Sequence, residues 1–221
     1  KASKTVLTGN PVRKELMVGN RLAAMEKFGL NPNLKTILVA GGSQGAQKIN
    51  RIILDSLVLL VKDFQIIHQC GESQFQSVKT ESEKIIKEGE GEYADAVKAN
   101  YKLYPFFDMN DMALAYAAAD IIISRAGAGS LFEIAMLGKP AIIIPITNST
   151  SNHQLKNALE FSKFGASMTE EQNLTPHIII SQINSLLQPD KYNSISEKLK
   201  TFGTPDAAQK IAEQLFSEFK V

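Results

Sequence analysis

Short apolar runs recur along this chain, separated by longer stretches in which apolar residues follow helical spacing. The short runs predict six strands, at residues 35–40, 64–70, 101–107, 120–124, 140–145 and 166–171. The runs at 120–124 and 140–145 are apolar without alternation, a pattern typical of strands covered on both faces of a parallel sheet. Pro105 interrupts the third run, so we expect that strand to end there.

The stretches between the strands predict helices. Residues 47–63 place Ile49 and Ile53 on one broad face, at the spacing of an amphipathic helix. Further helices are expected at residues 73–88, 109–119, 130 onward, 152–165 and 176–188, with two more at the end of the chain. Strand–helix steps joined by short loops predict a doubly wound, Rossmann-like α/β fold with a parallel sheet. We assign residues 21–221 to this domain and residues 1–20, which do not follow the alternation, to a lead-in or interdomain segment.

Several residues are expected to mark helix ends. Asn110 is a suitable N-cap for the third helix, and Ser130 for the helix after the fourth strand. Gly165 is a natural end for the helix at 152–165. Thr175 is expected to cap the next helix, with Pro176 in its first turn.

Composition excludes several classes of function. The 24 basic and 23 acidic side chains give a net charge of +1, too little to attract nucleic acid over long range. The single cysteine, Cys70, excludes internal disulfides and is compatible with a reducing cytoplasm. The three histidines show no metal-ligand spacing.

No apolar run reaches the roughly 18 residues that indicate a membrane span. The start at Lys1 suggests a processed chain or an excised fragment.

Candidate chemistry lies in the loops that follow the strands, because open α/β sheets bind ligands beyond the carboxyl ends of their strands. The loop at residues 40–47, AGGSQGAQ, has paired glycines before a helix expected to start at Ser43 or Gln44. Free amides at such a helix start bind phosphate or a related anion. The loop matches neither GxxxxGK[ST] nor GxGxxG. A tight turn with a serine cap is an equally good interpretation.

The second loop contains Gly127, Gly129 and Ser130, and Glu133 follows in the second turn of the next helix. An acid near a helix N-terminus is stabilised by the helix dipole by about 0.3–1 kcal/mol, which is one explanation for Glu133. The other is that its carboxylate accepts two hydrogen bonds from a vicinal diol such as a ribose. The residues alone leave both open.

The third loop and the start of its helix, residues 147–158, are polar. Gln154 and Asn157 lie one turn apart there, and their side-chain amides are candidates for gripping sugar hydroxyls. His153 is interpreted as a bystander. His68 is expected in or beside the core, and Cys70 as a small buried packing residue.

Four segments together resemble a known family. TGNPVR (8–13), GGSQGAQKIN (41–50), SRAGAGSLFEIAMLGKPAIIIP (124–145) and NHQLKNA (152–158) resemble, in that order, the carboxyl-terminal half of the MurG glycosyltransferases of family 28. These enzymes transfer N-acetylglucosamine from UDP-N-acetylglucosamine to a lipid-linked muramyl-pentapeptide (lipid I to lipid II) in peptidoglycan synthesis. The resemblance implies that the chain is one half of a GT-B glycosyltransferase, the half that binds the donor.

The resemblance also implies roles for individual residues. Glu133 would bind the ribose, Gln154 the N-acetylglucosamine hydroxyls, and the backbone of Phe107 the uracil. The FFDMNDM segment is two residues longer than related forms, so Phe106 or Asp108 are alternatives to Phe107. Contacts to the rest of the donor, chiefly its pyrophosphate, would come from Arg13, Ser43, Ala128, Gly129 and Ser130. Further contacts are expected from Gly42, Gln44, Gly127 and Asn157.

The other implied properties concern the complete enzyme. The catalytic base and the acceptor site would lie in an amino-terminal domain outside this chain, so the chain alone is expected to bind UDP without turnover. No metal cofactor is expected. The full-length enzyme would be cytoplasmic and peripheral at the cytoplasmic face of the inner membrane. Alternative interpretations are the donor-binding subunit of a split transferase, a non-catalytic nucleotide-binding or interaction module, and another UDP-sugar enzyme such as a UDP-N-acetylglucosamine 2-epimerase.

Overall fold

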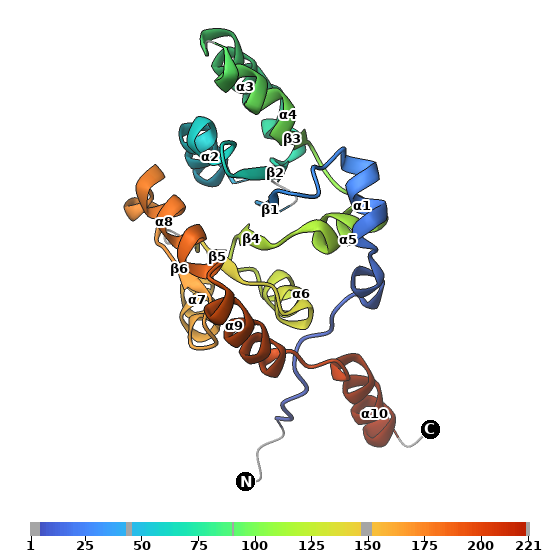
Figure 1. Cartoon of the computed structure of the whole chain (residues 1–221). Helices are drawn as coiled ribbons and strands as arrows, with labels where there is room; N and C mark the ends of the chain where they lie inside the picture. The colour runs from blue at the N-terminus through green and yellow to red at the C-terminus, as the bar shows by residue number, and fades with distance from the viewer. Residues whose placement is uncertain (1–4, 43–45, 90, 147–151, 220–221) are drawn as a thin grey trace.

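The computed structural model describes residues 5–42, 46–89, 91–146 and 152–219. Its centre is a six-stranded sheet in the order β3-β2-β1-β4-β5-β6 (Figure 1). All of the strand pairs are parallel, which confirms the predicted doubly wound α/β fold. The strands are β1 (Lys35–Ala40), β2 (Phe64–Gln69), β3 (Tyr101–Tyr104), β4 (Ile121–Ser124), β5 (Ala141–Ile143) and β6 (Ser167–Met168).

Burial on both faces explains why the central strands have no alternating pattern. Ile121, Ile122 and Ile123 of β4 are all fully buried, although their side chains point to opposite faces. Strand β3 ends at Tyr104, directly before Pro105, as the sequence predicts. The strand order reverses between β1 and β4, and this switch point lies near the middle of the sheet.

Helices cover both faces of the sheet, as Figure 1 shows. One face carries the 3-10 helix η1 (Lys14–Val18) and helices α1 (Arg21–Phe28), α5 (Met109–Ala118) and α6 (Ala128–Leu137). The other carries α2 (Gln47–Leu60), α3 (Glu72–Glu88), α4 (Glu92–Asn100) and α8 (Pro176–Leu186). The remaining elements are α7 (His153–Ser162), η2 (Glu171–Asn173), α9 (Pro189–Phe202) and α10 (Ala207–Phe219).

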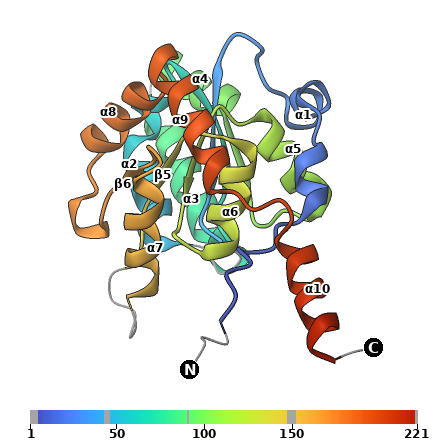
Figure 2. The same ribbon diagram turned by 90° about the horizontal axis from the view of Figure 1, so that it is seen from below.

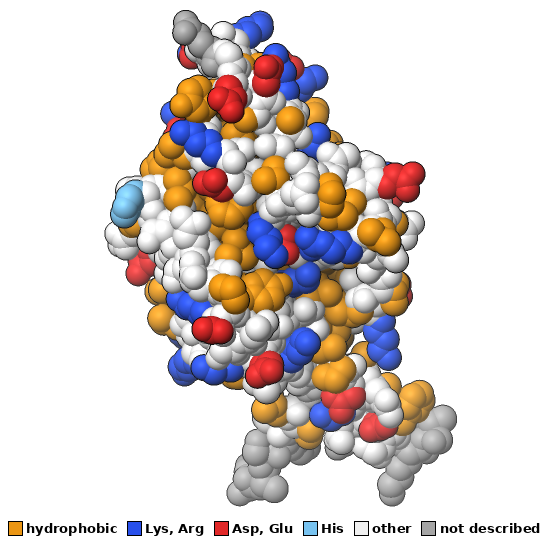
Figure 3. All heavy atoms as spheres, viewed as in Figure 1, with side chains coloured by type: hydrophobic (Ala, Val, Ile, Leu, Met, Phe, Trp, Pro, Cys, Tyr) orange, Lys and Arg blue, Asp and Glu red, His pale blue; other side chains and the backbone are white. Residues whose placement is uncertain are grey.

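Helices α9 and α10 complete the chain in different ways. Helix α9 packs on α6 and α8, whereas α10 extends away from the body beside the amino-terminal segment (Figure 2). None of the helices in the described part of the chain is both long and apolar enough to cross a bilayer. On the face drawn in Figure 3, Lys and Arg side chains are interspersed with Asp and Glu side chains.

Several predicted helix ends are wrong by a few residues. Asp108, not Asn110, caps α5, because its carboxylate lies one residue before the helix and accepts a hydrogen bond from the Asp111 amide at 2.8 Å. Ser130 lies inside α6, whose N-cap is Gly127. Helix α7 ends at Ser162, three residues before the expected Gly165. Helix α4 was missed.

Other expected helix ends and the packing of the lead-in are clear in the structure. Thr175 caps α8 through the Ile178 amide, with Pro176 in the first turn, as predicted. The lead-in contacts the domain through Leu16, which is buried where η1 packs on α5. The division between residues 1–20 and 21–221 stays a prediction.

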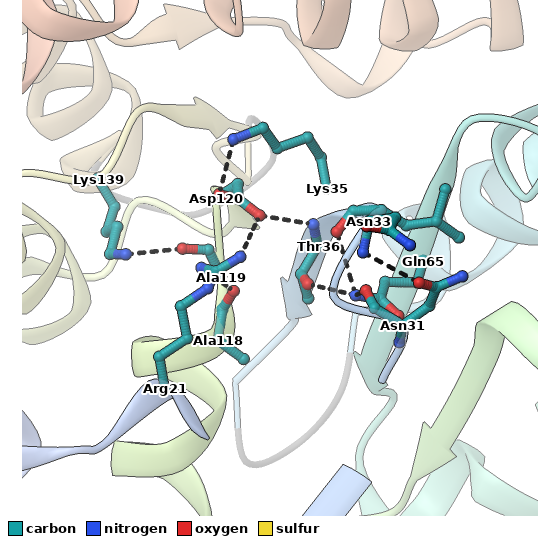
Figure 4. A network of polar contacts seen from close by, with 11 residues as sticks. Arg21, Asn31, Asn33, Lys35, Thr36, Gln65, Ala118, Ala119, Asp120 and Lys139 are labelled. Atoms are coloured by element: carbon teal, nitrogen blue, oxygen red, sulfur yellow. Dashed lines mark hydrogen bonds and ion pairs between the residues drawn. The ribbon is translucent and has the colours of Figure 1, made fainter. Parts of the chain in front are cut away.

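A buried carboxylate joins β1 and β4 at their amino ends, the edge opposite the predicted ligand loops (Figure 4). Asp120 accepts hydrogen bonds from the Thr36 amide at 2.8 Å and Arg21 Nη2 at 3.0 Å. Lys35 Nζ lies 3.4 Å from its other oxygen. Lys139 donates to the Ala119 carbonyl at 2.7 Å; burial lowers the pKa of Lys139, against the attraction of Asp120. The carboxylate of Asp120 therefore forms ion pairs with both Arg21 and Lys35 at this edge.

A second buried network links α2 to β2 and β3. His68 Nδ1 lies 2.8 Å from the Tyr101 hydroxyl, and Nε2 lies 3.0 Å from Asn50 Oδ1. The Asn50 amide donates to the Cys70 carbonyl at 3.0 Å. Since Asn50 Oδ1 can only accept, Nε2 carries the proton and Nδ1 accepts from Tyr101. His68 and Cys70 are both fully buried, which confirms their expected positions.

Burial lowers the pKa of His68 to about 3, and this shift predicts acid sensitivity. The unfolded histidine binds a proton below its pKa of about 6.5, but the folded one does not until about pH 3. The free energy of unfolding should therefore fall by up to about 1.4 kcal/mol per pH unit as pH drops from about 6 to 4. Urea unfolding across this range measures it. His68→Gln should show a shallower dependence of unfolding free energy on pH than the parent. His177→Gln, which changes an exposed histidine, serves as the control and should match the parent. The same pH dependence in all three proteins would contradict the prediction.

Candidate nucleotide-binding site

A hollow of about 180 Å³ opens beside the carboxyl end of β1, at the switch point between β1 and β4. Such switch points are where doubly wound sheets bind ligands. Five of the predicted site residues line it, from four separate segments: Arg13, Gly42, Phe107, Ser130 and Glu133. The fold therefore brings these five residues together, and their role in donor binding stays a prediction. Its other lining residues are Ala40, Gln69, Phe106, Met112 and Tyr116.

Glu133 is the charged centre of this hollow, and only 5% of its surface is exposed. Arg13 binds its carboxylate in bidentate fashion, with Nε 2.7 Å from Oε1 and Nη2 3.0 Å from Oε2. The Tyr116 hydroxyl donates to Oε2 at 3.2 Å. A stabilising interaction with the dipole of α6 alone would not require these two side-chain partners. The arrangement therefore indicates a carboxylate that is held in one orientation.

Glu133 raises the pKa values of both of its partners, Arg13 and Tyr116. The hydrogen bond to Glu133 raises the pKa of Arg13 above its already high value, so the guanidinium is charged at every physiological pH. Burial raises the pKa of Tyr116, and the negative charge of Glu133 raises it further. Tyr116 is therefore a neutral hydrogen-bond donor. It was missed because it reaches Glu133 from α5, and its only signal was a lone aromatic residue in the alanine-rich segment 109–119.

The start of α6 offers unpaired backbone amides at the rim of the hollow. Gly127 is the N-cap and no side chain caps this helix, so the amides of the first turn have no partner within the helix. A Cβ added at Gly129 would meet nothing within 4 Å, and one at Gly127 would meet only the Ser130 hydroxyl at 3.9 Å. Close packing therefore does not explain these two glycines. Ala128 and Gly129 are exposed, which leaves the first turn accessible.

The other end of the hollow is mostly apolar. Phe107 is buried and packs against Phe28 and Tyr104, with ring centroids 5.8 and 4.9 Å away. Phe106 is half-exposed, and Gln69 contributes an amide side chain on this side. Of the alternatives to Phe107, Phe106 also lines the hollow, whereas the carboxylate of Asp108 caps α5.

Gln154 and Asn157 lie on α7 and contact the loops that leave β4 and β5. Gln154 Oε1 accepts from the Ile146 amide at 3.2 Å, and Asn157 Nδ2 donates to the Ala126 carbonyl at 3.1 Å. Neither residue lines the hollow itself. Their sugar-binding role stays a prediction, with the Gln154 NH₂ group as the available donor.

Ser43, a predicted pyrophosphate contact, and Gln44, a possible further donor contact, lie outside the described residues. Within the described part of the chain, no group of His, Cys, Asp and Glu side chains is arranged to hold a metal ion.

Comparison with known proteins identifies the family of this fold. Residues 36–211 match the glycosyltransferase family 28 C-terminal domain. The chain belongs to this family. The family 28 match includes every strand of the sheet except the first residue of β1, and it covers every residue that lines the hollow except Arg13.

Bacterial transferases are among the relatives of this family 28 domain. A protein of Lactobacillus acidophilus, named UDP-N-acetylglucosamine–N-acetylmuramyl-(pentapeptide) pyrophosphoryl-undecaprenol N-acetylglucosamine transferase, is 39% identical, with 94% of this chain and 55% of that protein covered. A Bacteroides fragilis protein of the same name is 37% identical, with 97% and 54% covered. The chain therefore spans about half the length of these relatives.

Solved structures show the same architecture. The crystal structure of Acinetobacter baumannii MurG superimposes with a TM-score of 0.71 at 28% identity, covering 97% of this chain and 56% of that one. A UDP-GlcNAc 2-epimerase from Neisseria meningitidis bound to UDP-GlcNAc gives a TM-score of 0.59 at 18% identity, covering 89% and 48%. At that identity the second likeness shows the fold alone. The fold is one Rossmann-like half of the GT-B type.

Proposed function

We propose that this family 28 domain binds UDP-N-acetylglucosamine as the donor half of an inverting N-acetylglucosaminyltransferase of peptidoglycan synthesis. The observation that carries this proposal is the oriented carboxylate of Glu133 beside the free amides of α6, in a hollow at the switch point of the sheet. The names of the relatives supply the donor sugar and the acceptor class.

The two ends of the hollow fit the two ends of a nucleoside diphosphate. Phe106, Phe107 and Met112 form an apolar side suited to a flat base, with Gln69 beside them. Glu133 offers two carboxylate oxygens to the ribose hydroxyls, and the start of α6 offers amides and a positive dipole to the diphosphate. We assign the N-acetylglucosamine hydroxyls to Gln154.

In the transfer reaction, an acceptor hydroxyl attacks the anomeric carbon of the donor and the bond from that carbon to the UDP oxygen breaks. The acceptor proton goes to a base that we place in the other half of the enzyme. The departing UDP gains negative charge, which the amides of Ala128, Gly129 and Ser130 and the guanidinium of Arg13 stabilise. In other transferases a metal ion stabilises the negative charge of the departing diphosphate; here these hydrogen-bond donors do so.

The same proposal places the lipid-linked muramyl-pentapeptide on the other half of the enzyme. Contact with the membrane is peripheral and belongs to that half, at the cytoplasmic face. The isolated chain binds the donor weakly, because one wall of the cleft is outside it.

Calorimetric titration of the chain tests this function. UDP and UDP-N-acetylglucosamine should bind at up to millimolar concentrations, and ADP should bind more weakly because its base is larger. No heat and no amide shifts with millimolar UDP would contradict the proposal. Adding back an amino-terminal half and measuring transfer then separates a donor domain, which becomes active, from a non-catalytic nucleotide-binding module.

The substitution Ala128→Pro tests the amides of α6 separately from the fold. Ala128 is the first helical residue, where proline fits and its missing N–H removes no helical hydrogen bond. Gly127 before it is extended, with ψ of 133°, as a residue preceding proline prefers. UDP affinity should fall about tenfold, since one hydrogen bond to a charged group is lost, with the melting temperature kept. Ala128→Ser, which retains the amide, should bind as the parent does; equal affinity for both variants would contradict the assignment.

A further inference from the structure

The carboxylate assigned to the ribose is already occupied in this structure. Arg13 covers one edge of Glu133 with two hydrogen bonds, one to each oxygen. A vicinal diol would bind a carboxylate in the same way, with one hydroxyl on each oxygen. The guanidinium and a ribose therefore compete for the same edge of Glu133.

We propose that Arg13 closes the empty ribose subsite and is drawn away by the donor's diphosphate, while Tyr116 keeps the carboxylate oriented throughout. This inference rests on the proposed function. It makes Arg13 a residue that discriminates a nucleoside diphosphate from a nucleoside, and Tyr116 a positioning residue.

The burial of the two partners decides which one leaves. The side chain of Arg13 is 49% exposed, and its residue precedes η1 in extended backbone with φ of −76°. Tyr116 is 3% exposed within α5 and donates to Oε2 from inside the fold. Moving the half-exposed Arg13 side chain into solvent leaves the packing of the fold intact, whereas moving a buried tyrosine would disturb the packing of α5. Arg13 is therefore the exchangeable partner.

The destination of Arg13 follows from its chemistry. A guanidinium binds phosphate oxygens through paired hydrogen bonds, as it binds a carboxylate. Arg13 and Ser130, which lies in the first turn of α6, line the same hollow, so a diphosphate at that turn is within the region that Arg13 borders. A diphosphate therefore compensates for the broken ion pair, whereas an uncharged nucleoside must displace Arg13 without compensation.

The substitution Arg13→Gln separates these effects, because it should change the affinities for uridine and UDP in opposite directions. Uridine should bind about threefold more tightly, since its competitor is gone, and UDP about tenfold more weakly, since a phosphate partner is lost. Amide chemical-shift titrations at about pH 8, where carboxylates are ionised, measure both. Lys14→Gln removes the same charge from the next residue, which is exposed, and should change the uridine-to-UDP ratio by less than about twofold.

Two further variants complete the test. Arg13→Lys keeps the positive charge but cannot form the paired hydrogen bonds of a guanidinium. Its affinities for uridine and for UDP should lie between those of the parent and Arg13→Gln. Tyr116→Phe should narrow the preference for uridine over 2′-deoxyuridine. The proposal that the ribose replaces Arg13 on Glu133 would be overturned by either of two results. One is weaker or unchanged uridine binding by Arg13→Gln, and the other is an unchanged preference for uridine over 2′-deoxyuridine in Tyr116→Phe. Failure of the parent chain to bind either ligand would instead overturn the proposed function.

Discussion

Replacement of Glu133 with alanine is expected to weaken UDP binding by about 30-fold or more. Two hydrogen bonds from the ribose to a charged acceptor are lost, each contributing about 1.5–3 kcal/mol. The loss is smaller than their sum, because the freed Arg13 no longer has to leave Glu133 before it binds the diphosphate. Calorimetric titration with UDP measures the change, and melting curves show whether the fold is retained.

Matched variants and ligands show whether the effect belongs to the ribose. Glu133→Gln retains an acceptor for the Tyr116 hydroxyl but loses the charge, so its affinity should lie between those of the parent and Glu133→Ala. Glu160→Ala removes an exposed carboxylate on α7 and should leave binding unchanged. The parent should prefer UDP over 2′-deoxy-UDP, and Glu133→Ala should not. Equal affinity of the parent for the two ligands would contradict the ribose assignment.

Replacement of Asp120 with alanine is expected to lower the free energy of unfolding by about 2–4 kcal/mol, because the buried Thr36 amide is left without a partner and the charged hydrogen bond from Arg21 is lost. The carboxylate is 6% exposed and pairs with Arg21, Lys35 and the Thr36 amide. Without it, the cations repel one another and the Thr36 amide loses its partner. Urea unfolding at neutral pH measures the loss.

Asp63 provides the control for this prediction. It lies directly before β2, as Asp120 lies directly before β4, but it is exposed. Asp63→Ala should therefore change the unfolding free energy by no more than about 0.5 kcal/mol. A loss below about 1 kcal/mol for Asp120→Ala would show that the network at the amino edge contributes little. Folded Asp120→Asn protein should still bind UDP, because the hollow lies at the opposite edge of the sheet.

The strands were predictable from the sequence because burial on both faces requires a short, continuous run of apolar residues. The isoleucine run of β4 and Pro105 after β3 each report a constraint that acts within a few residues. Helix α4 has no such local signal: the EGEGE segment at residues 88–92, which runs into its first residue, has the composition of a solvent loop, and only Ala94 and Val97 of this helix are buried. Helix α4 is formed by packing on α3 and β2, which a local pattern does not show.

The sequence predicts which residues gather at the hollow, but not the hydrogen bonds between them. The glycine-rich turn at 127–129 and Glu133 follow a strand, so their common location at the sheet edge is a local inference. The bonds of Glu133 to Arg13 and Tyr116 join positions 120 and 17 residues away, and no periodicity relates them. The pairing of Arg13 with Glu133 changes the interpretation of both residues, since the family resemblance assigns each of them to the donor separately.

A chemical-shift map of the chain with UDP-N-acetylglucosamine tests donor binding at this hollow most directly. The backbone amides of Gly42, Phe107 and Ala128 to Ser130 should shift in a saturable way, with Glu133→Ala reducing the affinity. The amides around Asp120 at the opposite edge should not shift. Shifts centred away from the hollow, or none at millimolar ligand, would contradict a donor site built on Glu133 and the first turn of α6.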